Sequence, residues 1–211
     1  MADSPSTRSV KIAADERTGW SSDRPRREPA VPRPYDASVR GRVLRPSDRL
    51  RYVPGSLVVI ASAAPATRDA FAARTVEDKP AILSMDKGRA LLQGRVAADQ
   101  LEAKAAELLD AAVNKRLNAG DGVGLLSGVL EEDRQRFVVP AAKLRRPRHL
   151  ILLEVGRDEV PEDERPALNA MRNALDAGGL GDEGFHTAMR LSAGAASEVK
   201  RIVFRPPPSD D

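Results

Sequence analysis

The segment Leu57–Arg74, which reads "LVVIASAAPATRDAFAAR", decides the fold that the sequence predicts. Its first five residues, Leu57–Ala61, form a continuous apolar run with the length of a buried strand. A short loop follows, and "RDAFAAR" then has the composition of the opening turns of a helix. Because the run shows no polar alternation, we expect this strand in a parallel sheet that is covered on both faces.

Strand and helix signals alternate along the rest of the chain. Four further apolar runs are predicted strands: Ala81–Ser84, Val123–Ser127, Leu150–Glu154 and Arg201–Phe204. Apolar stripes at helical spacing lie between them, at Leu101–Leu117 (before Asn118-Ala119-Gly120), at Phe137, Ala141 and Leu144, and at Leu168, Met171 and Leu175. The alternation predicts an α/β domain over residues 55–205, with three layers, a parallel five-stranded sheet and right-handed crossovers.

The two ends of the chain have a different composition. Residues 1–54 contain seven of the 16 prolines, and they carry 12 Arg and Lys against seven Asp and Glu. We predict a disordered basic arm over 1–54 and a disordered tail over 206–211. The arm is either a docking segment for an anionic surface or a protein partner, or a solubilising tail.

Composition excludes several classes of protein. The chain has no cysteine, which excludes a disulfide framework and thiolate chemistry. No apolar run approaches the ~20 residues of a membrane span, and the N-terminus lacks a signal peptide, so we expect no membrane contact and a cytoplasmic location. Of the two histidines, His149 is expected to open a strand as an edge residue and His186 to lie in a helix, and neither lies in a catalytic-triad pattern.

The loop after the first strand can be compared with the phosphate-loop pattern G-x-x-x-x-G-K-[ST], laid over eight residues from Ser62. Ser62 and Thr67 occupy the glycine positions, although a left-handed backbone costs a non-glycine residue roughly 1–2 kcal/mol. Pro65 removes a backbone N–H from the middle of the cradle. Arg68 keeps the charge of the lysine, and Asp69 replaces the hydroxyl that binds Mg²⁺.

The wider sequence resembles the P-loop kinase domain of bacterial polynucleotide kinases and related zeta-toxin-like and antibiotic phosphotransferases. The resemblance covers Leu57 to Phe204 and is carried by the opening segment, by "AILSMDKGRALLQG" and by "AAELLDAAVNKRLNAG". It implies a P-loop kinase type of sheet, with Asp86 as the general base and Arg89 as the residue that holds an acceptor phosphate. Without the resemblance, Asp86 is a helix N-cap followed by a solvated helix face.

Two further positions follow from the same resemblance. The family carries an acidic residue after its third strand, whereas this chain has Ser127 and Gly128 there. Lid arginines of such kinases would correspond to Arg157, Arg165 and Arg172. The acidic residues around these arginines argue against a triphosphate site, and ion pairs on a helix surface account for them as well.

The sequence therefore favours a pseudoenzyme, a kinase-like domain with a degenerate nucleotide-binding loop that serves as a protein-interaction or regulatory module. No cofactor is expected, and a protein partner would bind through the arm or the carboxyl edge of the sheet. The alternative is an ATP- and Mg²⁺-dependent phosphotransferase, acting on a polynucleotide or a small molecule through Arg68, Asp86 and Arg89. A third hypothesis, nucleic-acid binding through the arm, has only Trp20 and Tyr35 for stacking.

Overall fold

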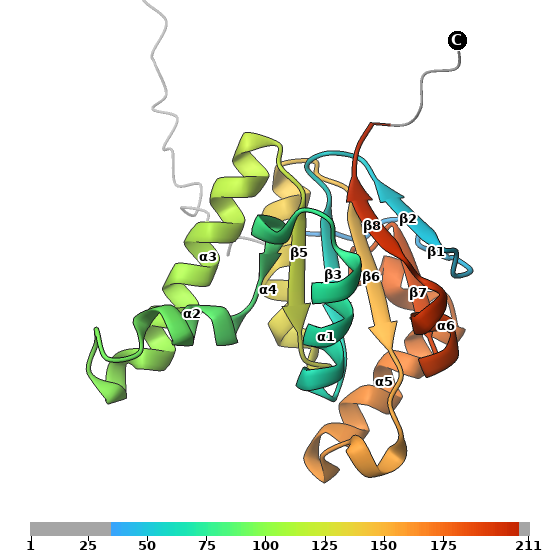
Figure 1. Ribbon diagram of the computed structural model, residues 1–211. Coiled ribbons are helices and arrows are strands. Elements are labelled where there is room, and N and C mark those ends of the chain that lie inside the picture. Colours follow the sequence, from blue (N-terminus) through green and yellow to red (C-terminus); the bar gives the residue numbers. More distant parts are fainter. Residues whose placement is uncertain (1–34, 207–211) are drawn as a thin grey trace, which may run out of the picture. The chain divides into compact units, whose positions relative to one another are not determined.

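A six-stranded parallel sheet organises the part of the chain that the structure, a computed structural model, describes, residues 35–206 (Figure 1). Its strand order is β1-β7-β6-β3-β5-β4. The strands are β1 (Arg42–Val43), β3 (Leu57–Ala61), β4 (Ile82–Leu83), β5 (Val123–Ser127), β6 (Arg148–Leu153) and β7 (Thr187–Leu191). A second parallel sheet contains two strands, β2 (Arg49–Tyr52) and β8 (Arg201–Phe204).

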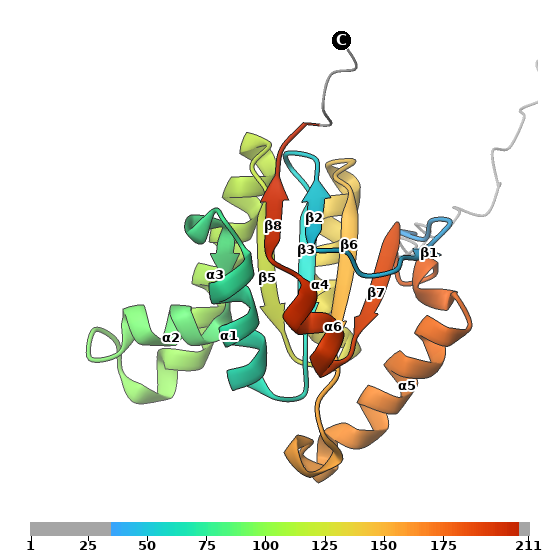
Figure 2. The ribbon, with the colours of Figure 1, turned by 45° about the vertical axis from the view of Figure 1, so that its right-hand side comes forward.

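Helices and the small sheet cover both faces of the large sheet (Figure 2). The helices are α1 (Pro65–Thr75), α2 (Met85–Leu92), α3 (Leu101–Ala119), α4 (Glu131–Lys143), α5 (Arg165–Asp176) and α6 (Ala193–Glu198). Short 3₁₀ turns lie at Lys79–Ala81, Ala98–Gln100, Arg157–Glu159, Glu162–Glu164 and Gly179–Gly181. None of the helices among residues 35–206 is long and apolar enough to cross a membrane.

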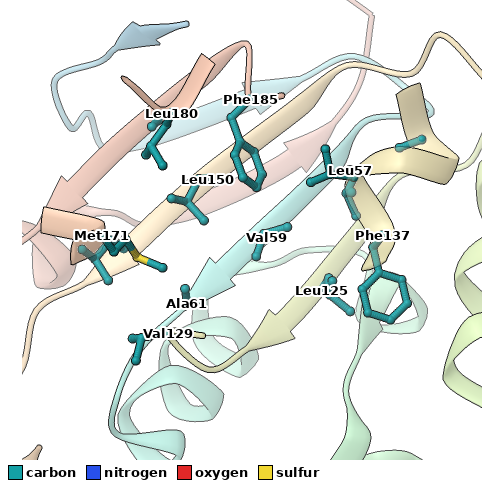
Figure 3. Close-up of a cluster of buried hydrophobic side chains, with 14 of the residues drawn as sticks. Leu57, Val59, Ala61, Leu125, Val129, Phe137, Leu150, Met171, Leu180 and Phe185 are labelled. Atoms are coloured by element: carbon teal, nitrogen blue, oxygen red, sulfur yellow. The ribbon is translucent and has the colours of Figure 1, made fainter. Parts of the chain in front are cut away.

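The alternating burial of the side chains of strand β3 shows why the fold has three layers. Leu57, Val59 and Ala61 pack into one hydrophobic cluster, with side chains of α3, α4 and α5 (Figure 3). Val58 and Ile60 pack into the other, with side chains of α1, β2 and β8. All five residues are fully buried, because successive side chains of a strand point to opposite faces. The predicted α/β fold with a parallel sheet covered on both faces is therefore confirmed.

The predicted helices also form. The stripe at Leu168, Met171 and Leu175 is the buried face of α5. Helix α3 ends at Ala119, and Gly120 follows in the left-handed conformation (φ 81°), a common helix terminator. Helix α1 begins at Pro65, three residues earlier than "RDAFAAR" suggests, because proline is favourable in the first helical turn.

The predicted five-stranded sheet is wrong in the number and identity of its strands. Arg201–Phe204 does form a strand, β8, but it pairs with β2 in the small sheet. The large sheet instead contains β7, which pairs with β6 on one side and β1 on the other. The sequence of β7, "TAMRL", did not predict a strand because the exposed Arg190 interrupts its short apolar run.

The end of the predicted arm also differs from the expectation. Within residues 35–54, β1 pairs with β7, and β2 pairs with β8 through Arg49 opposite Arg201. Leu50 and Tyr52 are buried in the same cluster as Ile60. Two apolar residues at alternate positions are too weak a signal for a strand in a basic, proline-containing context. The remainder of the predicted arm, residues 1–34, and most of the predicted tail, 207–211, lie outside the described residues.

His149 is not on an edge strand, because β6 lies between β3 and β7. Its ring lies 4.6 Å from that of Tyr52, and Nδ1 is 2.7 Å from Thr187 Oγ1. Burial, together with the nearby His186 and Arg148, lowers the pKa of His149 to about 4. His186 precedes β7 and does not lie in a helix; its Nδ1 accepts the N–H of Arg148.

The first prediction concerns this partly buried imidazole. Between pH 6.5 and 4 the unfolded chain binds a proton at His149 that the folded chain does not, so stability rises with pH across this interval. We expect the free energy of unfolding to fall by up to about 3 kcal/mol as the pH drops from 7 to 4.5. His149→Asn, which retains a polar atom near Thr187, should remove most of this slope in denaturant titrations. An unchanged slope would contradict the assignment, and His186→Asn is the control for the more exposed histidine.

The second prediction tests how the N-terminal segment of the described chain packs. A Cβ on Gly181 would lie 2.2 Å from Val39 O, and the amide N–H of Val39 donates to Gly181 O at 2.8 Å. Gly181→Ala should therefore lower the free energy of unfolding by about 1–3 kcal/mol, because backbone atoms must move apart. Gly194→Ala, in α6 with no atom within 4 Å of its Cβ, is the matched control and should be neutral or stabilising. Equal unfolding midpoints for the two variants would exclude this close packing.

Candidate functional site

The turn between β3 and α1 contains only the three residues 62–64. Ser62 is buried, and its hydroxyl donates to Leu153 O and accepts the N–H of Ala64, both at 3.2 Å. Arg145 is the only non-glycine residue among residues 35–206 with a positive φ, so this turn has no left-handed residue. The Ser62 hydroxyl and the N–H of Ala64 are therefore already hydrogen-bonded within the protein.

These features bear on whether the turn can hold a triphosphate with Mg²⁺. A phosphate loop needs several backbone N–H groups that converge on one point, and left-handed residues allow that geometry. Here Pro65, at the start of α1, has no N–H, and the N–H of Arg68 is bonded to Ala64 O. The residues of the turn do not fit a Mg²⁺–triphosphate.

Arg68 stands where a phosphate loop has its lysine, and it is buried, with 5% of its surface exposed. Its Nε donates to Asp69 Oδ1 at 2.9 Å, and its Nη2 donates to Asp86 Oδ2 at 3.2 Å. Burial of a guanidinium is costly unless carboxylates or carbonyls bind it. The charge of Arg68 is therefore compensated within the protein by two carboxylates.

The ion pairs continue from Asp86 to α3. Arg89 donates to Asp86 Oδ1 at 2.6 Å and, through two nitrogens, to both oxygens of Glu102 at 2.8 Å. The hydrogen bonds to Arg89 hold the pKa of Glu102 below its usual value. The N-cap of α2 is Ser84, whose Oγ accepts the N–H of Lys87, and not Asp86 as the alternative prediction had it. Four of the predicted site residues, Arg68, Asp69, Asp86 and Arg89, thus form one network of alternating charge.

The network borders a cavity of about 490 Å³ beyond the carboxyl ends of β3 and β5. Helix α1 leaves β3 toward one face of the sheet, and α4 leaves β5 toward the other (Figure 2). Such a divergence of neighbouring connections is where open α/β sheets bind ligands. The charged side chains that line the cavity are Arg68, Asp86, Arg89, Glu102, Asp133, Arg136 and Glu164. This cavity is the candidate site.

Several of its polar groups were not identified from the sequence. Ser127, at the end of β5, lines the cavity, and its Oγ has no hydrogen-bond partner among the described residues. The same holds for Glu164 Oε2. Burial and the nearby Asp163 and Asp133 raise the pKa of Glu164, and Arg68 acts in the opposite direction. The position of Asp133, six residues after the end of β5, was the signal that could have placed it at this edge of the sheet.

The remaining predicted residues lie elsewhere. Arg157, Arg165 and Arg172 line a separate cavity of about 320 Å³, and Arg172 Nε donates to Glu154 at 3.0 Å. Thr67 lines a largely apolar groove of about 630 Å³ between α1 and α6. The three lid candidates therefore do not line the cavity that Arg68 and Asp86 border.

Comparison with known proteins gives no relative. No family model matches the chain, and no curated protein matches it. Among residues 35–206, no group of three or more histidine or acidic side chains has an arrangement that would hold a metal ion.

The third prediction tests the ion pair between Arg68 and Asp86, at the buried end of the network. Asp86→Asn should lower the free energy of unfolding by about 1 kcal/mol, because it weakens the compensation of buried Arg68 while Asp86 itself is half exposed. In the Arg68→Met background the same change should cost less, which gives a coupling energy of at least about 0.5 kcal/mol in a double-mutant cycle. Glu107→Gln, in the exposed Lys104–Glu107 pair, is the control and should stay within about 0.5 kcal/mol. Additive effects at Arg68 and Asp86 would contradict the coupling.

Proposed function

We propose that this protein is a pseudoenzyme: an α/β module that resembles P-loop kinases in sequence but acts as a protein-interaction or regulatory domain, without ATP or another cofactor. The observation that carries the proposal is the burial and ion pairing of Arg68. Arg68, the cation that a phosphate loop would direct at a triphosphate, is buried and bound to Asp69 and Asp86.

The electrostatics of the cavity support the proposal. A triphosphate would have to displace Asp69 and Asp86 from Arg68. It would then lie beside two carboxylates that had lost their ion pair with Arg68. At ~5 Å and an effective dielectric near 20, each unit of like charge repels by roughly 3 kcal/mol. The three-residue turn offers few N–H groups to offset this cost.

The partner we propose is a protein that docks at the carboxyl edge of the sheet. Pockets at this edge of open α/β folds present side chains from several loops on a rigid support. The cavity beside β5 supplies both charged and apolar groups for such a contact. The basic N-terminal segment, residues 1–34, adds a second docking element in this proposal.

The fourth prediction is that Mg²⁺–ATP and Mg²⁺–GTP do not bind. A ligand present at 100 times its Kd adds about 2.7 kcal/mol of stability, or several degrees in Tm for a chain of this size. We expect no rise in Tm at 5 mM nucleotide with 10 mM MgCl₂, by calorimetry on the full chain. The same nucleotide with EDTA controls for non-specific anion effects. A rise of several degrees that requires Mg²⁺ and is lost in Arg68→Met would overturn the proposal.

A second candidate function, an atypical phosphotransferase, is favoured by one observation: Arg68, Asp86 and Arg89 do meet at one cavity. Against it, both oxygens of Asp86 already accept hydrogen bonds from arginines, so a base role requires one of these bonds to break. Incubation with γ-labelled ATP and polynucleotide or small-molecule acceptors decides between the two. Label transfer that disappears in Asp86→Asn would establish the kinase, whereas silence of both proteins supports the pseudoenzyme.

A further inference from the structure

The cavity beside β5 carries an excess of negative charge. Each of the three arginines that line it binds a carboxylate, in the case of Arg136 that of Asp110. Two lining carboxylates, those of Asp133 and Glu164, make no ion pair with any residue between 35 and 206. A ligand that enters this space therefore meets two carboxylates without an ion-pair partner among residues 35–206, although Arg68 lies close enough to Glu164 to influence it.

Ser127 provides an independent indication of a ligand. The residue is 6% exposed, and its Oγ has no hydrogen-bond partner within the part of the chain that the structure describes. It lies on the same side of β5 as Leu125, the side that packs against α3 and α4, and it lines the cavity. A buried hydroxyl without a partner is unfavourable by about 1–3 kcal/mol, so its presence here calls for a partner that comes from outside the chain.

The fold accounts for the negative charge of Asp133 but not for that of Glu164. Asp133 lies in the first turn of α4, where the free N–H groups of the helix favour a negative charge. Glu164 is the N-cap residue of α5, yet its side chain makes no capping hydrogen bond, and its Oε2 is buried without a partner among the described residues. The fold therefore leaves Glu164 and Ser127 as acceptors that a ligand can satisfy.

Part of the wall, beside the paired charges of Arg68, Asp86, Arg89, Glu102 and Arg136, is apolar. Met85, Leu109, Leu125 and Phe137 line the same cavity, whose volume of about 490 Å³ lies in the range of small-ligand sites. An apolar wall beside unpaired acceptors suits a ligand with an alkyl chain and a cationic head that carries several N–H donors. Because no group of three metal-binding side chains is present in residues 35–206, an organic cation fits better than a metal ion.

We infer that this cavity binds an alkyl guanidinium or alkyl ammonium group, with its N–H donors on Ser127 Oγ and the carboxylates of Glu164 and Asp133, and its alkyl chain against Leu125 and Phe137. The group belongs either to a free amine or to an arginine or lysine side chain of a partner protein; both share this chemistry. The inference deepens the proposed function and rests on it, because a working triphosphate site would require the same cavity to accept anions.

The fifth prediction tests the inference by calorimetric titration of the full chain. The probes are agmatine and an acetylated, amidated Gly-Gly-Arg-Gly-Gly peptide, with the citrulline peptide as the uncharged control. We expect saturable binding of at least one cationic probe, and a Kd that rises about tenfold or more in Ser127→Ala and in Glu164→Gln. Glu162→Gln, two residues from Glu164 on an almost fully exposed side chain, should leave the Kd unchanged.

Each outcome decides one point. Binding of agmatine identifies a free amine as a ligand, and binding of the arginine peptide alone identifies a side chain of a partner protein. No saturable heat up to 5 mM with either probe, equal binding of the citrulline peptide, or insensitivity to both variants would overturn the inference. If a variant does not fold stably, the test is made on the wild type by NMR. Binding of a cationic probe should then change the amide chemical shifts of residues 127–133 and 164 only. Mg²⁺–ATP is titrated into the same samples; its binding would overturn the proposed function separately.

Discussion

The burial of β3 on both faces is the constraint on which this fold depends. Because its side chains alternate between two hydrophobic clusters, each face needs its own cover, and helices between residues 65 and 198 supply it together with the small sheet. The central position of β3 also fixes the chemistry of the cavity. Its connection to α1 diverges from that of β5 to α4, and the polar ends of these strands therefore face a common space.

Strong local signals predicted the core of the fold. The bounds of β3 and β5 follow from unbroken apolar runs, and α5 from Leu168, Met171 and Leu175. The sheet to which β8 belongs could not be predicted, because pairing depends on contacts between residues far apart in sequence, and its partner β2 has only two buried residues. The strand β7 was missed because the exposed Arg190 interrupts its short apolar run.

The candidate site was predicted only in part, again because contacts between residues far apart in sequence could not be predicted. Motif spacing brought Arg68, Asp69 and Asp86 to attention, and they do lie together. Spacing gave no means to see that Arg68 is bound by both carboxylates, or that Ser127 and Glu164 lack partners within residues 35–206. Those facts arise from the packing of six separate segments around one cavity. The proposed loss of nucleotide chemistry and the proposed cation site are two consequences of that packing.

The small sheet has a consequence for synthesis of the protein. Strand β2 pairs with β8 across some 150 residues, and Leu50 and Tyr52 share a hydrophobic cluster with Ile202. While the chain emerges from the ribosome, β2 is made before β8 and cannot pair until Arg201–Phe204 has been translated. The face of the large sheet under β2 and β8 thus lacks this cover until β8 has been made, and nonlocal pairing of this kind slows folding.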